Sequence, residues 1–216
     1  MKKIALLLGL MVSMVSMVSF AASAANTTAT LTADNEFWLY SGNATGSSLT
    51  LQGEGHNWGT AFSFSFNVNP GDYLYVAAKD WGGPQSWQGA FTTPNGALYS
   101  NTASWTFIVA PNGDTGQAAV QSNIGAGGWA NPVAQTAYNA WPWGAPVGNV
   151  NANWIWHDNL GLANGWNEQS SSDGTYGIFR SAQAVSAVPE PSSYAMMLGG
   201  LGLVALLRRR KNAISV

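Results

Sequence analysis

Residues 61–68 read Ala-Phe-Ser-Phe-Ser-Phe-Asn-Val, with apolar and polar side chains in strict alternation. Successive side chains of a β-strand point to opposite faces, so the three phenylalanines and Val68 share one face while the serines and Asn67 share the other. The pattern predicts a strand with one face in a core and the other in water. Residues 69–72 have the composition of a turn, and the continuously apolar residues 72–78 predict a second strand at the centre of a sheet.

Similar strand patterns recur on both sides of this hairpin. They predict further strands at residues 28–33, 36–41, 48–52, 88–93, 104–110, 153–157 and 174–181, with Trp154 and Trp156 on one face of their strand. Asp34 and Asn35 form a turn pair between the first two of these strands. About nine strands with almost no helix predict an all-β fold, an antiparallel two-sheet sandwich of jelly-roll type.

Glycine and proline predict where this pattern is interrupted. Three glycines lie within residues 53–59 and predict a loop there. Residues 79–96 include Gly82, Gly83 and Pro84, so we expect Trp81 and Trp87 on or beside a second loop. Residues 115–153 predict long loops with one short helix or strand. The chain has no cysteine, so packing rather than disulfides must hold the fold.

The N-terminus has the features of an export signal. Lys2 and Lys3 precede an apolar run, and small residues at positions 21–25 predict cleavage by signal peptidase after Ala24 or Ala25. A retained N-terminal anchor is the alternative. We therefore divide the chain into a signal peptide at 1–25, one exported domain at 26–185 and a C-terminal segment at 186–216.

Charge is sparse in the predicted domain. Residues 26–185 contain two cations, Lys79 and Arg180, against nine acids, a formal balance of 2 − 9 = −7. A domain of this charge repels polyanions, so nucleic acid is a poor candidate partner.

The C-terminal segment joins three unlike features. Val188, Pro189, Glu190 and Pro191 favour extended backbone that an enzyme can grip as a strand. Residues 193–207 carry no charge and predict a single transmembrane helix of about 22 Å, at about 1.5 Å per residue. The basic cluster that follows marks the cytoplasmic flank and comprises Arg208, Arg209, Arg210 and Lys211.

This order of features resembles the PEP-CTERM sorting signal of Gram-negative bacteria. The resemblance implies that an exosortase-type enzyme recognises the signal and removes the anchor, in a host that makes exopolysaccharide. It also implies a precursor anchored in the inner membrane with its domain in the periplasm, and a final location at the cell surface or in the extracellular matrix. An ordinary C-terminal anchor after a chance Pro-Glu-Pro is the alternative.

Residues 32–42, with Trp154-Ile-Trp156 and Ile178-Phe-Arg180, resemble galactose-binding-domain-like sandwiches. The resemblance concerns the fold more than any particular ligand.

All eleven tryptophans lie within residues 38–166, which makes indole the main candidate for ligand binding. An indole face packs on the C–H face of a sugar while its N–H stays free to hydrogen-bond. Loop positions favour Trp81, Trp87, Trp141 and Trp143 as carbohydrate-binding residues. The alternative is that indoles fill a disulfide-free core, which we expect of Trp38, Trp105, Trp154 and Trp156.

No catalytic motif accompanies these aromatic residues. His56 lies near Glu54 and His157 adjoins Asp158, but no nucleophile or phosphate-loop signature is present, so we expect no catalytic residues. Acidic turn residues allow structural calcium without specifying a site, and we predict no metal or cofactor. We expect a non-enzymatic surface protein that binds carbohydrate or exopolysaccharide. A structural matrix or adhesion protein and a glycan hydrolase are the alternatives.

Overall fold

The computed structural model describes residues 24–110, 116–137, 139–157, 176–186 and 198–202. The chain divides into two compact units, Ala24–Ala187 and a second unit made of Met1–Ser23 with Val188–Val216. Of the second unit only residues 198–202 are described, and they are helical. Among the described residues no helix has the length and apolar character needed to cross a membrane.

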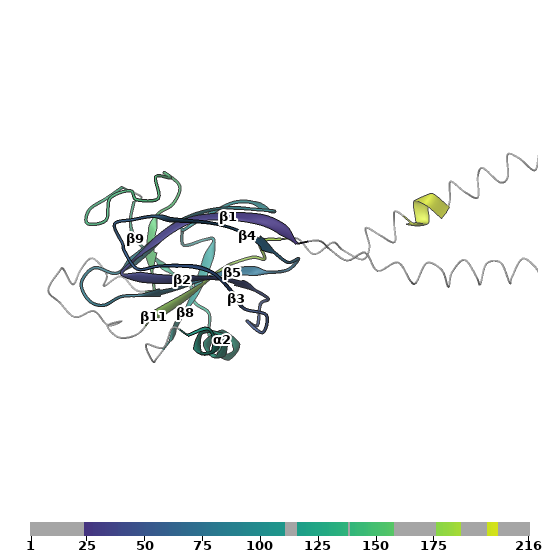
Figure 1. Ribbon diagram of the computed structural model, residues 1–216, viewed down its shortest axis with the longest axis horizontal. Coiled ribbons are helices and arrows are strands. Elements are labelled where there is room, and N and C mark those ends of the chain that lie inside the picture. The colour runs from purple at the N-terminus through teal and green to yellow at the C-terminus, as the bar shows by residue number, and fades with distance from the viewer. Residues whose placement is uncertain (1–23, 111–115, 138, 158–175, 187–197, 203–216) are drawn as a thin grey trace, which may run out of the picture. The chain divides into compact units, whose positions relative to one another are not determined.

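The first unit consists of two antiparallel sheets (Figure 1). The β1 sheet has the order β4 (Phe62–Val68), β1 (Ala25–Asp34), β6 (Ser86–Thr93), β10 (Trp154–Trp156) and β9 (Val133–Thr136), with β7 (Gly96–Tyr99) also paired to β6. The β2 sheet has the order β3 (Thr50–Gly55), β2 (Glu36–Gly42), β5 (Tyr73–Lys79), β11 (Tyr176–Ser181) and β8 (Trp105–Ala110). The predicted all-β sandwich is confirmed.

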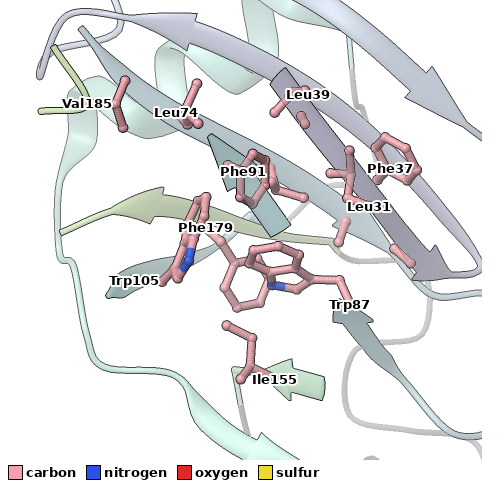
Figure 2. Close-up of a cluster of buried hydrophobic side chains, with 14 of the residues drawn as sticks. Leu31, Phe37, Leu39, Leu74, Trp87, Phe91, Trp105, Ile155, Phe179 and Val185 are labelled. Carbon is pink, nitrogen blue, oxygen red and sulfur yellow. The ribbon is translucent and has the colours of Figure 1, made fainter. Parts of the chain in front are cut away.

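The main core lies between the sheets (Figure 2). The ring of Trp87, from β6, lies 4.8 Å from that of Trp105 and 5.5 Å from that of Phe179, both from the β2 sheet. Leu31 and Leu39 fill the same cluster from β1 and β2. The inward-facing side chains of both sheets therefore form the core together, while alternate side chains on each strand point outward.

The β2 sheet is also covered on its outer face. Helix α2 (Gln117–Ala126) lies beside the strands of the β2 sheet (Figure 1). Its Val120 and Ile124 belong to a second apolar cluster that includes Tyr75 and Ile178. Burial on both faces explains the continuously apolar β5, and the prediction that it lies at the centre of a sheet is confirmed.

Two loop predictions were wrong in part. Residues 53–55 belong to β3, because the Phe64 ring occupies the place of a side chain at Gly53, and the Phe62 and Phe37 rings do so at Gly55. These glycines let aromatic rings close the sandwich against bare backbone.

The second predicted loop, beside Trp81 and Trp87, ends earlier than expected, because the strand predicted at residues 88–93 already begins at Ser86 as β6 (Ser86–Thr93). Within the predicted loops of 115–153, the described residues contain both α2 and β9.

Both ends of the first unit meet at one end of the sandwich, which we call the exit end. Ala25 is paired with Val68, and the turn that follows β4 binds the C-terminal residues of the unit. The Gly71 N–H donates to the Ser186 carbonyl at 2.9 Å, and the Val185 N–H donates to the Asp72 carbonyl at 2.8 Å. β1 runs from the exit end to Asp34, about 30 Å away at about 3.3 Å per residue. We call the end at Asp34 the distal end.

Candidate functional site

The distal end is organised by Asp34, the last residue of β1. Its side chain is buried, and Oδ2 accepts a hydrogen bond of 2.7 Å from the Trp143 indole N–H. Trp143 in turn stacks on Trp154, with ring centroids 4.8 Å apart. The Trp154 indole N–H donates to the Gly144 carbonyl at 3.1 Å. The segment that contains Trp141 and Trp143 is therefore tied to the β1 sheet at Trp143 and at Gly144.

Asn35, the next residue, ties down a second segment. Its backbone N–H donates to the Lys79 carbonyl at 2.8 Å, and its side-chain Oδ1 accepts the Trp81 backbone N–H at 2.7 Å. The Lys79 ammonium lies 4.0 Å from the Trp81 ring centroid. This cation–π contact holds the indole beside the turn.

These two segments carry two exposed indoles. Trp81 is 60% exposed and Trp141 is 70% exposed, the two highest values for large aromatic residues in the described chain. Each belongs to a segment whose backbone or neighbouring side chain is hydrogen-bonded to Asp34 or Asn35. We take Asn35, Trp81 and Trp141 as the candidate site and call it the distal surface; Lys79, which is 8% exposed, contacts the Trp81 ring but contributes little surface.

The predicted carbohydrate-binding roles of Trp87 and Trp143 were wrong. Trp87 is fully buried in β6, where it packs between the sheets. Trp143 is 4% exposed, because its ring stacks on Trp154 and its N–H is committed to Asp34. Neither can present an indole face to a ligand.

The core assignments of the other tryptophans agree with the structure in three cases. Trp105, Trp154 and Trp156 are fully buried, whereas Trp38 is half-buried beside the His56 ring. Trp154 and Trp156, expected on one face, have different neighbours: Trp154 packs on Trp143, and Trp156 packs 5.6 Å from Phe179 in the main core. A register irregularity between Trp154 and Ile155 accompanies this difference.

His56 contacts two carboxylates on the surface. Its Nδ1 lies 3.3 Å from Glu36 Oε1 and its Nε2 lies 3.6 Å from Glu54 Oε1. Sequence spacing indicated Glu54 alone, since Glu36 comes from β2 and reaches His56 through strand pairing. His157 packs its ring near Phe107 and Trp156, and its neighbour Asp158 lies outside the described residues.

The acidic turn residues have structural roles where they are described. Asp72 Oδ2 accepts the Asn69 backbone N–H at 2.9 Å and so closes the turn after β4. Within the described ranges, no group of three or more His, Asp or Glu side chains is arranged to hold a metal ion.

Comparison with known proteins concerns the other end of the chain. A family model described as the PEP-CTERM protein-sorting motif matches residues 187–211, which begin directly after Ser186. The chain carries a PEP-CTERM sorting motif. This motif implies an exported protein that an exosortase-type enzyme processes from a membrane-anchored precursor. The predicted sorting residues at 188–191 and 208–211 fall inside the matched range but outside the described residues.

Searches of curated proteins and of solved structures gave no significant match. The resemblance of the domain to galactose-binding-like sandwiches therefore stays a prediction.

Asp34 gives the distal end a testable pH dependence. Burial raises the pKa of its carboxyl from the ordinary 3.8 to about 6, while the hydrogen bond from Trp143 lowers it. Because the folded state holds this proton more tightly than the unfolded state, the Asp34 contribution is fully present below pH 3.8 and is lost as the pH rises through about 6.

We expect the free energy of unfolding of the wild type, minus that of Asp34→Asn, to fall by roughly 2–3 kcal/mol between pH 3.5 and pH 7. Urea titrations of both proteins measure this difference. Subtracting the two free energies cancels the pH dependence that comes from the acidic groups that both proteins share. A difference independent of pH would contradict the assignment.

Proposed function

We propose that this chain is a cell-surface or extracellular-matrix protein that an exosortase-type system delivers and whose domain binds carbohydrate or exopolysaccharide. In this proposal residues 1–25 are a signal peptide, and a transmembrane helix at 193–207 anchors the precursor in the inner membrane with the jelly-roll domain in the periplasm. The match of residues 187–211 to the sorting motif carries the export and sorting part. The host would be a Gram-negative bacterium that makes exopolysaccharide.

The exit end supports processing on both sides of the domain. β1 begins at Ala25, so cleavage after Ala24 or Ala25 leaves the strand almost complete. On the other side, the Ser186 carbonyl accepts a hydrogen bond from the turn after β4, and the matched motif begins at the next residue. Both cuts can therefore be made without unfolding the sandwich.

Replacing Pro189, Glu190 and Pro191 together with alanine should block processing in the native host, because the rigid extended segment that the enzyme grips is lost. Immunoblots of membrane and released fractions would show the full-length precursor accumulating in the membrane. The matched control is Ser192→Ala with Ser193→Ala, which changes adjacent residues and should be processed normally. Normal processing of the triple variant would refute the role of the motif.

The distal surface supports the carbohydrate part of the proposal. Trp81 and Trp141 are the most exposed aromatic side chains among the described residues, and the half-buried Asn35 lies beside Trp81. A few oriented polar groups beside aromatic faces are typical of neutral sugar sites. This site lies at the end of β1 opposite the exit end, and it replaces the four-tryptophan set expected from sequence.

Trp81→Ala and Trp141→Ala should each weaken binding to the responsive polysaccharide at least tenfold, because each removes one sugar-stacking face. The measurement is a glycan array, followed by gel retardation with the host's exopolysaccharide, using residues 24–187 with and without calcium. Leu51→Ala is the control, since Leu51 is 43% exposed on β3 and lies outside the site.

Unchanged binding by both tryptophan variants would place the site elsewhere. No binding to any glycan would favour a structural matrix or adhesion role, and released sugars in product analysis would favour a hydrolase over our non-enzymatic assignment.

A further inference from the structure

β4 is an edge strand of unusual character. It comes first in the β1 sheet and pairs with β1 in unbroken register from Phe62 to Val68. Its sequence contains no charge and no proline. Ser63, Ser65 and Asn67 are exposed, and the three phenylalanines between and beside them are half-buried. A long, flat, uncharged edge of this kind offers unpaired backbone groups to another strand.

The other edges of the sandwich carry features that discourage pairing. β3 has the exposed Glu54 and a register irregularity against β2. β8 is partly covered, because Phe107 and Ala130 exchange two backbone hydrogen bonds of 2.8 and 2.9 Å. β9 and β7 have only four residues each. Short, charged, irregular or covered edges are the usual protections against sheet-to-sheet association, and within the described part of the chain β4 shows none of them.

We propose that β4 is a self-association edge through which two copies of this domain pair antiparallel about Ser65. In that register Ser65 lies opposite Ser65, Phe64 opposite Phe66, and Ser63 opposite Asn67. Phe62 then lies opposite Val68. Apolar residues face apolar ones and polar residues face polar ones along the whole strand, as a two-fold interface between identical surfaces requires.

A second copy is the occupant that this strand fits best. The strand provides no charge that could select a charged partner, and its alternation is symmetric about Ser65. Joining two copies would continue the β1 sheet of one into the β1 sheet of the other. Main-chain hydrogen bonds would then give affinity while the phenylalanines bury their exposed edges.

The register fixes the orientation of such a pair. β4 ends at the exit end, beside Ala25. Antiparallel pairing of two β4 strands therefore points the two exit ends in opposite directions.

A cysteine scan tests the register, because the chain has no cysteine of its own. Opposed residues of antiparallel strands have Cα atoms about 4.5–5.5 Å apart, within the range that a disulfide spans. Under mild oxidation, Ser65→Cys in residues 24–187 should form a disulfide-linked dimer, whereas Ser63→Cys and Asn67→Cys alone should not. A mixture of these last two should form the mixed dimer.

Equal cross-linking by Ser63→Cys and Ser65→Cys in residues 24–187 would indicate parallel, in-register pairing and would overturn the proposal. Absence of a Ser65→Cys dimer would overturn it too.

A charge at the dyad gives an independent test without cysteine. Ser65→Lys puts two ammonium groups opposite each other and should weaken dimerisation at least tenfold in sedimentation equilibrium. Ser122→Lys on the exposed surface of α2 is the matched control and should leave the dimer unchanged. A wild-type domain that stays monomeric, or a Ser65→Lys dimer as tight as that of the control, would refute self-association. Because failure of sorting or of glycan binding leaves these measurements unaffected, the two proposals can be distinguished.

Discussion

The packing of Trp87 against Trp105 and Phe179 joins the two sheets, and the rest of the domain depends on it. The three rings come from β6, β8 and β11, strands that are far apart in sequence. The chain has no cysteine, so this aromatic contact holds the two sheets together where many exported sandwiches have an inter-sheet disulfide. It has a cost: the Trp87 indole N–H is buried without a hydrogen-bond partner among the described residues. Apolar area and shape are therefore what this side chain contributes.

Fixing β6 also fixes the distal end. Trp87 is paired with Ala33 and Ser86 with Asp34, so the position of β6 sets the position of the turn at Asp34 and Asn35. That turn holds the backbone of Trp81 and the indole of Trp143. The exposed Trp81 and Trp141 therefore lie in loops whose attachment points are fixed by the packed core. A rigid scaffold commonly positions a loop-based binding site in this way.

Much of the fold follows from local pattern, because alternation and continuous apolarity report directly on burial. Residues 61–68 and 72–78 predicted the half-buried strand and the central strand correctly, whereas nothing in residues 61–68 indicated an edge position. Gly53 and Gly55 led to a wrong loop prediction. A single sequence does not distinguish a glycine that makes room for an aromatic ring from a glycine that permits a turn. Trp87 misled because Gly82, Gly83 and Pro84 do form a loop, and nothing local shows that the strand resumes at Ser86.

The candidate site was only half predictable for a related reason. Proline and glycine place Trp141 and Trp143 in the same irregular segment, but the hydrogen bond to Asp34 that buries one of them joins residues 109 positions apart. The contact between Glu36 and His56 likewise depends on strand pairing. By contrast, the sorting motif was readable because its function resides in a short linear order of residues, which is also why a family model matches it.

Trp87 belongs to the packed core, whereas Trp81 belongs to an exposed surface. The same change, Trp→Phe, at each position separates these roles when the free energy of unfolding of residues 24–187 is measured by urea titration. We expect Trp87→Phe to lose about 1–3 kcal/mol through a cavity between the sheets, while Trp81→Phe stays within about 0.5 kcal/mol of the wild type. Equal losses at the two positions, or a loss confined to Trp81→Phe, would contradict these roles.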